Sequence, residues 1–289
     1  MSQPGGGLGV TAIYTSQVAR WGGLAHASLY DGGPGRVVFW LTSLFVGLGR
    51  LVQPGVPSLA VSILHRQVLF DRILERLGAQ AVMELAAGLS RRGVLLSDDP
   101  RVQVVELDVP EVVKLKEELL ARSPQGRAVL ERGNLRRVGL DLGDPRLDDA
   151  ALAAQAPPGS PLVVTAEGLC MYLSASAQRA LWSRVQALLA ARGGGSFVFD
   201  LVPAVEQAPP GRVGRLLGRL MAAFTGGQGF VRDERGRADI VEELRGLGFS
   251  SVEAIEPRLV AEEWALPRPR ERSQQVVFLA RVERGLQSV

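Results

Sequence analysis

Acidic side chains stand at the ends of several short hydrophobic runs in this sequence, namely Asp108, Asp141, Glu167 and Asp200. A carboxylate at such a point can bind a ligand's hydroxyl or amino groups, or it can cap the next helix or stay solvated. For one isolated acid, a cap or a solvated group is the commoner outcome. Because Asp108, Asp141 and Glu167 recur at three successive expected strand ends, the pattern favours a shared ligand site.

The run Ala81–Leu85 leads into a turn of small residues, Ala86, Ala87 and Gly88. Small side chains let a ligand approach the backbone closely, although an ordinary tight turn has the same composition. The turn lacks the Gly-x-Gly-x-x-Gly pattern that packs a pyrophosphate against a helix, which argues against NAD or FAD. Asp108 follows Gly88 by about 20 residues, the spacing at which an acid commonly binds ribose hydroxyls.

Four positions offer contacts to a nucleoside that carries an amino acid. Asp141 can accept the exocyclic amine of adenine while Leu142 packs on the ring. Glu167 follows a strongly hydrophobic run and needs a partner, either a sulfonium ligand, its amino group or an internal arginine. Arg66 lies on the hydrophobic stripe of an expected helix, where it can clamp a carboxylate with two hydrogen bonds or extend to water.

Hydrophobic periodicity predicts seven strands with helices between them. The expected strands are Gln80–Leu85, Val102–Leu107, Leu135–Leu140, Leu162–Ala166, Ser196–Leu201, Ser251–Ile255 and Gln275–Val282. The expected helices are Pro57–Leu77, Gly93–Ser97, Pro110–Arg122, Asp148–Gln155, Ser174–Arg192 and Ile240–Leu247. Ser174 is an expected helix cap, and Asp239 with Glu242 resembles a capping box. The alternation predicts an α/β fold, a mostly parallel sheet with helices on both faces and ligands beyond the carboxyl ends of the strands.

The expected organisation is one Rossmann-like domain with an N-terminal addition. Residues 1–56 mix glycine with aromatic residues and are expected to form a helical cover over a site, with residues 1–10 mobile. Residues 57–289 form the expected ligand-binding domain. Within it, residues 203–235 are expected to be a lid-like insertion, in which Gly226 and Gly227 form either a flexible loop or a simple turn.

Composition excludes several classes of protein. With one cysteine, Cys170, and two histidines, His26 and His65, a protein-held metal centre is not expected. A formal charge of +3 with interspersed acids is weak support for nucleic-acid binding, so we expect no nucleic-acid partner. No hydrophobic run approaches the roughly 20 residues that span a bilayer, so we expect no membrane association and a cytoplasmic location.

From about Thr11 to the expected C-terminal strand, and most specifically in four segments, the chain resembles the leucine carboxyl methyltransferase family, and more closely its bacterial O-methyltransferases of polyketide biosynthesis. The segments are Glu84–Ser90, Glu106–Pro110, Glu167–Leu173 and Phe224–Gly227. The resemblance implies a Rossmann-like class I methyltransferase fold and S-adenosylmethionine as the cofactor, converted to S-adenosylhomocysteine without a metal. Relatives usually carry proline where Arg91 stands here, which is a departure in the turn after Ser90.

The resemblance also implies a role for each candidate cofactor residue. Arg66 would bind the methionine carboxylate, Asp108 the ribose hydroxyls, and Asp141 with Leu142 the adenine. Glu167 would lie near the methionine amino group or the ribose, and Tyr14 would fold over the cofactor. The remaining positions expected to line this site are Glu84, Ala86, Ala87, Gly88 and Gly168.

The expected reaction is methyl transfer to an oxygen of a small molecule. The donor is already activated, so the protein mainly aligns the nucleophile, the methyl group and the sulfur. A carboxylate acceptor is ionised near neutral pH, whereas a phenol, with a pKa of about 10, would benefit from a base such as His26. The expected acceptor pocket consists of Trp21, Met171, Tyr172, Asp200 and Phe224, although such residues are often only core packing.

Two other functions stay open at this stage. A catalytically silent binding protein could keep the cofactor residues without turnover. A nicotinamide-dependent oxidoreductase is disfavoured by the missing phosphate-binding pattern. The sequence does not define the acceptor or the oligomeric state.

Overall fold

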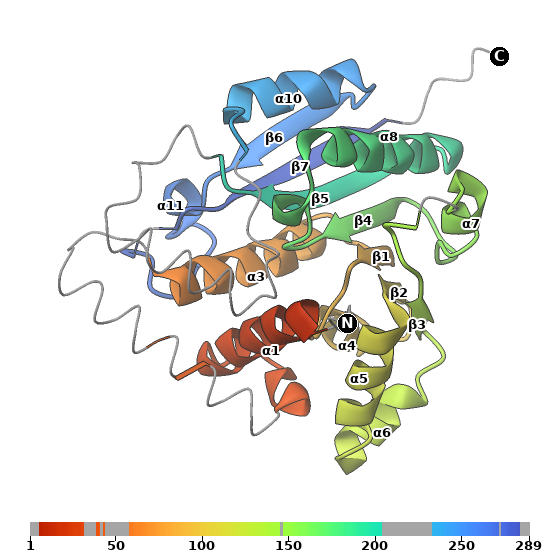
Figure 1. The fold of residues 1–289 in the computed structure, drawn as a ribbon, viewed down its shortest axis with the longest axis vertical. Coiled ribbons are helices and arrows are strands. Elements are labelled where there is room, and N and C mark those ends of the chain that lie inside the picture. The colour runs from red at the N-terminus through yellow and green to blue at the C-terminus, as the bar shows by residue number, and fades with distance from the viewer. Residues whose placement is uncertain are drawn as a thin grey trace.

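In this computed structural model, the described residues are 6–31, 39, 40, 43, 58–144, 147–203, 233–271 and 273–283. The strands are β1 (Ala81–Leu85), β2 (Gln103–Asp108), β3 (Leu135–Gly139), β4 (Leu162–Ala166), β5 (Gly195–Leu201), β6 (Ser251–Ile255) and β7 (Val276–Val282). The α-helices are α1 (Gly6–Trp21), α3 (Leu59–Arg76), α4 (Arg92–Leu96), α5 (Pro110–Leu120), α6 (Pro124–Leu130), α7 (Asp149–Ala153), α8 (Ala175–Ala191), α10 (Arg237–Gly246) and α11 (Pro257–Val260). Two short 3₁₀ helices, η1 (Ala27–Tyr30) and η2 (Cys170–Tyr172), complete the described elements (Figure 1).

The seven strands form one sheet in the order β3-β2-β1-β4-β5-β7-β6. The pairs from β3 to β5 are parallel, whereas β7 pairs antiparallel with both β5 and β6. This is the α/β fold with a mostly parallel seven-stranded sheet that the sequence predicts. Because β1 to β5 run in the same direction, their carboxyl ends meet at one edge, where a ligand site is expected.

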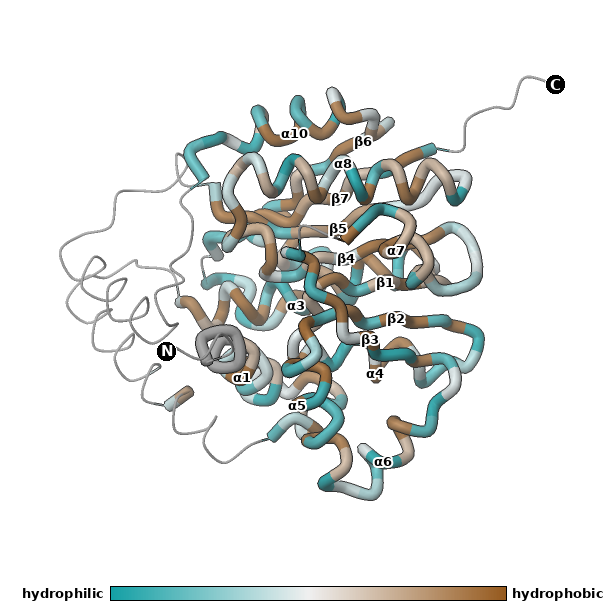
Figure 2. Tube along the Cα trace, turned by 45° about the vertical axis from the view of Figure 1, so that its right-hand side comes forward, coloured by the Kyte–Doolittle hydropathy of each residue, from teal (hydrophilic) through white to brown (hydrophobic). Residues whose placement is uncertain are grey.

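Two layers of helices bury the two faces of the sheet. Helices α7, α8 and α10 cover one face, on which Trp182, Phe197 and Phe199 form part of the core. Helix α3 covers the other face over β1, β4, β5 and β7, and η1, α4, α5 and α6 cover β2 and β3. Figure 2 shows hydrophobic stretches along the strands between these layers.

Helix α1 packs against α3 and against the turn after β1. Tyr14 and Val18 are buried with Ile63 and Leu64 of α3. A Cβ atom placed on Gly88 would lie 3.6 Å from the Ala12 side chain, so α1 also covers the small-residue turn. Figure 1 shows α1 beside α3. That residues 1–56 form a cover over a site stays a prediction.

The structure corrects three expectations about local structure. Residues 1–10 are not irregular throughout, because α1 begins at Gly6 and its packing on α3 outweighs the poor helix propensity of glycine. Asp239 is not the cap of α10; the cap is Gly236, whose N–H donates to Asp239 Oδ2 at 2.8 Å. Helix α6 was not expected from the sequence, although Ser123 caps it through the Gly126 N–H.

Candidate functional site

Arg66 of α3 lies between two carboxylates at the carboxyl edge of the sheet. Its Nε donates to Glu167 Oε1 at 2.9 Å, and its Nη1 donates to Asp200 Oδ2 at 3.3 Å. Gly168 covers the guanidinium plane, since a Cβ there would lie 3.1 Å from both Nη atoms. Among the described residues, no acceptor is hydrogen-bonded to Arg66 Nη2.

Arg92 of α4 connects Glu167 to the body of the sheet. Its Nη2 donates to Glu167 Oε2 at 2.6 Å, and its Nη1 donates to Glu84 Oε1 at 2.8 Å. Its Nε donates to Asp71 Oδ1 of α3 at 3.0 Å, and Asp71 also pairs with Arg91. We call the set of Arg66, Asp71, Glu84, Arg91, Arg92, Glu167 and Asp200 the charge network.

The charge network shifts the pKa values of its acids in opposite directions. Burial raises the pKa of Glu167, but the charges of Arg92 and Arg66 outweigh it, so the pKa lies below its usual value. Burial also raises the pKa of Asp200 and of Glu84, and the neighbouring guanidinium groups offset only part of that effect. Glu167 is therefore the carboxylate most firmly held in its ionised form.

The turn after β1 brings backbone N–H groups towards Asp108. Ala86 and Gly88 both have left-handed backbones, with φ of 50° and 52°, a conformation that costs an alanine about 1 kcal/mol. Gly88 N–H donates to Asp108 Oδ2 at 2.6 Å, and Val109 N–H donates to Oδ1 at 2.8 Å. Burial raises the pKa of Asp108, and these N–H donors oppose that rise. Asp108 is thus held against the small-residue turn.

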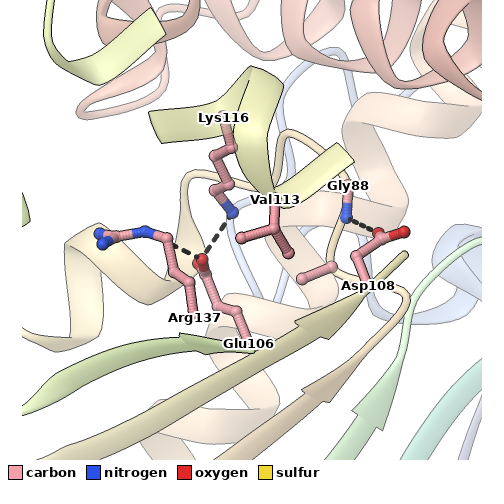
Figure 3. Close-up of a pocket in the computed structure, with 7 residues that line it drawn as sticks. Gly88, Glu106, Asp108, Val113, Lys116 and Arg137 are labelled. Atoms are coloured by element: carbon pink, nitrogen blue, oxygen red, sulfur yellow. Dashed lines mark hydrogen bonds and ion pairs between the residues drawn. The ribbon is translucent and has the colours of Figure 1, made fainter. Parts of the chain in front are cut away.

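A pocket beside this turn contains a second cluster of buried charges (Figure 3). Glu106 of β2 pairs with Lys116 Nζ of α5 at 2.8 Å and with Arg137 Nε of β3 at 3.6 Å. Glu106 also stands directly opposite Glu84 on β1, so the two clusters meet across one strand pair. The residues lining the pocket are Ala87, Gly88, Glu106, Asp108, Val113, Lys116 and Arg137.

The other predicted cofactor residues lie around this edge with different exposure. Asp141 is exposed and accepts a hydrogen bond from Gly143 N–H at 2.8 Å, while Leu142 is half-buried against the core. Tyr14 is buried against Phe39, with ring centroids 5.7 Å apart, and burial raises its pKa to about 12. Of the predicted cofactor residues, the structure places Arg66 in contact with both Glu167 and Gly168. It also places Gly88 in contact with Asp108.

The predicted acceptor residues do not form one contact group in the described part of the chain. Met171 is buried. Tyr172, which follows it, acts on Arg66 in the direction that raises the pKa of the guanidinium group. Asp200 is fully buried, and both of its oxygens accept hydrogen bonds, from Arg66 Nη1 and from Gly168 N–H. Trp21 stacks under Arg268, whose Cζ lies 4.0 Å from the ring centroid. The predicted residue Phe224 lies outside the described residues, as does most of the expected insertion at 203–235.

The two histidines lie in different surroundings. His26 Nε2 pairs with Asp98 Oδ2 at 2.6 Å, in the connection that leads into the amino end of β2. From there β2 runs about 16 Å to Asp108 at its carboxyl end. His65 neighbours Arg66 on α3, and its Nε2 contacts Pro267 O at 2.7 Å. Burial lowers the pKa of His65. Neither histidine touches the charge network through a hydrogen bond among the described residues.

Sequence reasoning missed Arg92, Lys116 and Arg137. Arg92 follows another arginine in a turn, and such charges usually face water. The sequence did contain a signal for the burial of Lys116. Lys116 stands three residues after Val113 and four after Val112 on α5, and therefore on the helix face that contacts the sheet. Over the described residues, no group of three His, Cys, Asp or Glu side chains is arranged to hold a metal ion, and no helix is long and hydrophobic enough to cross a membrane.

Comparison with known proteins agrees with this geometry. Residues 49–186 match the family described as leucine carboxyl methyltransferase. A protein of Mycobacterium marinum named "Putative S-adenosyl-L-methionine-dependent methyltransferase" is 33% identical over 218 residues, 71% of this chain and just under two thirds, 66%, of its own length. A protein of the same name from Mycobacterium sp. strain KMS is 42% identical over 115 residues, 40% of this chain and 37% of that protein.

Two solved structures share the fold. A DUF574 family protein from Streptomyces avermitilis superposes with a TM-score of 0.56 and 16% identity, covering 94% of this chain and 97% of that one. A protein from Thermobifida fusca described as a "putative methyltransferase" superposes with a TM-score of 0.54 and 17% identity, covering 94% of this chain and 93% of that one. The fold is that of the class I methyltransferases. Residues 49–186 match the leucine carboxyl methyltransferase family, the family that the motifs of the sequence resemble.

The buried pair between Lys116 and Glu106 predicts a large effect on stability. Replacing Lys116 with methionine leaves Glu106 with only the longer contact to Arg137, so the free energy of unfolding should fall by about 3 kcal/mol in a urea titration. Lys114→Met is the matched control, because Lys114 lies on the exposed side of the same helix. Equal stability of the two variants would contradict the structural role of the pair.

The close approach of Gly168 to Arg66 predicts an effect on cofactor binding. Gly168 has φ of +70°, and an alanine Cβ would push against the guanidinium group. We expect Gly168→Ala to weaken binding of S-adenosylmethionine, the predicted cofactor, by about tenfold in calorimetry through loss of charge-assisted hydrogen bonds. Gly133→Ala is the control, since no atom lies within 4 Å of its Cβ position. Equal affinity of the two variants would count against Arg66 as a binding group.

Proposed function

We propose that this protein is an S-adenosylmethionine-dependent O-methyltransferase that acts on a carboxylate or phenolic hydroxyl of a small molecule in secondary, polyketide-like metabolism. The observation that carries the proposal is the position of Arg66, buried at the carboxyl edge of the sheet between Glu167 and Asp200. A guanidinium group fixed in this way recognises a ligand carboxylate by geometry as well as by charge. The names of the Mycobacterium relatives support the same cofactor.

The charge balance of the network suits this cofactor. Four carboxylates, from Asp71, Glu84, Glu167 and Asp200, face the guanidinium groups of Arg66, Arg91 and Arg92. S-adenosylmethionine brings one carboxylate and two cationic groups, an ammonium and a sulfonium. Its carboxylate would bind Arg66, and its net positive charge would compensate the excess carboxylate. Asp108, at the neighbouring strand end, would hold the ribose hydroxyls.

The chain's own part in the reaction is to bind, orient and exclude water. When bound, S-adenosylmethionine supplies the activated methyl group. Arg66, Glu167 and Asp108 would fix its two ends, and α1 packs over the turn at Gly88, where it would keep water out. Between the two acceptor classes, a carboxylate fits better, because it needs no base and His26 pairs with Asp98 at the amino end of β2.

Calorimetric titration with S-adenosylmethionine and S-adenosylhomocysteine tests the cofactor site. We expect saturable binding by the wild type and a loss of at least about tenfold in folded Arg66→Ala and Asp108→Ala variants, because each removes a charged hydrogen-bonding group. Circular dichroism and thermal melting establish that the variants are folded. Absence of binding by a well-folded wild type would overturn the proposal.

Turnover separates an enzyme from a binding protein that has lost activity. Radiolabelled methyl transfer would be measured across aromatic and aliphatic carboxylic acids and phenols. Methyl ester or ether products support the enzyme. Cofactor binding without any product across the panel would instead favour the catalytically silent protein. Preferential binding of NAD would point to an oxidoreductase.

A further inference from the structure

Among the described residues, Arg92 contacts carboxylates on three different elements of the site. Its side chain is 3% exposed and lies over the Phe70 ring, with Cζ 5.1 Å from the ring centroid. Its carboxylate partners are Asp71 on α3, Glu84 on β1 and Glu167 after β4. A single guanidinium group thus ties one helix and two strand segments together below the predicted cofactor.

The hydrogen bonds of Arg92 direct it away from a ligand. All three of its nitrogens donate to protein oxygens, and Nη2 also donates to the Gln67 carbonyl at 3.4 Å. The effect of Arg92 on a ligand must therefore pass through a partner. Glu167 is that partner, because its Oε2 accepts from Arg92 at 2.6 Å while its Oε1 accepts from Arg66 at 2.9 Å.

We propose that Arg92 is a positioning residue for the cofactor site, which fixes Glu167 in the orientation that holds Arg66 ready for the cofactor's carboxylate. The inference rests on the proposed function. With both oxygens of Glu167 bound to guanidinium groups, the carboxylate has one orientation rather than several, and Arg66 is restrained with it. Arg91, the next residue, pairs only with Asp71 among the described carboxylates and does not reach Glu167.

The contacts of Glu167 with Arg92 and Arg66 determine at which pH Glu167 loses its charge. The charged groups facing Glu167 are Arg66 from α3, Arg92 from α4 and Asp200 from β5, with Asp71 and Glu84 sharing Arg92. Burial raises the pKa of Glu167, and Arg92 is the first of the cations that lower it again. Without Arg92, less of the effect of burial on Glu167 is offset, so the pKa of Glu167 rises. As the pH then falls through that higher pKa, Glu167 becomes neutral and releases Arg66.

The test compares Arg92→Met and Arg92→Lys with the matched variants Arg101→Met and Arg101→Lys, because Arg101 is exposed and pairs with Asp99 outside the charge network. Dissociation constants for S-adenosylmethionine would be measured by calorimetry between pH 6 and pH 8.5 and divided by the wild-type value at each pH, which cancels titration of the cofactor itself. We expect Arg92→Met to bind about tenfold more weakly at pH 8, with the ratio growing towards pH 6. The Arg101 variants should give ratios near one at every pH.

Arg92→Lys keeps a cation but cannot bridge three carboxylates, so its ratio should lie between those of the wild type and Arg92→Met. If Arg92→Met fails to fold, the ratio measured for Arg92→Lys still tests the inference. Adding Glu167→Gln to Arg92→Lys or Arg92→Met should abolish the pH trend. Wild-type binding together with flat Arg92 ratios equal to those of Arg101 would overturn the inference. If the wild type does not bind the cofactor at all, the proposed function fails instead.

Discussion

The interaction on which this site depends is the pair of contacts between one carboxylate and two buried guanidinium groups. Glu167 lies between Arg66 and Arg92, with nitrogen–oxygen distances of 2.9 and 2.6 Å. Charges removed from water are costly unless each has well-placed partners. That requirement constrains α3, α4 and the ends of β4 and β5 together, because each contributes at least one member of the network. Displacing any of these elements would leave a buried charge without its partner.

The same constraint explains the arrangement of the sheet below the site. Glu84 and Glu106 stand opposite each other on β1 and β2, and each has its own cations, Arg92 for the first and Lys116 with Arg137 for the second. Two neighbouring carboxylates in a buried sheet repel each other unless such compensation is present. Paired charges therefore extend from the site into the core of the sheet. They hold the side chains of the site in place before a ligand binds.

Much of the fold could be predicted because hydrophobic runs mark buried parallel strands. Leu162–Ala166 and Ser251–Ile255 were predicted to the residue, and the others within one or two residues. Helix α6 was missed because its short sequence has no clear hydrophobic period, and the start of α1 at Gly6 was missed because its first turn is rich in glycine. For Glu167 the sequence left a ligand partner and an internal ion pair open, and for Arg66 a ligand carboxylate and extension to water. The structure pairs these two residues with each other. Arg92 could not be recognised, since its burial depends on which distant carboxylates the fold brings near it.

The most direct measurement is a crystal structure of the protein with S-adenosylhomocysteine bound. The account predicts the ligand's carboxylate within hydrogen-bonding distance of Arg66 Nη2, its ribose hydroxyls on Asp108, and Glu167 still held by Arg92. A ligand bound elsewhere, or one whose amino-acid end does not approach Arg66, would contradict the account.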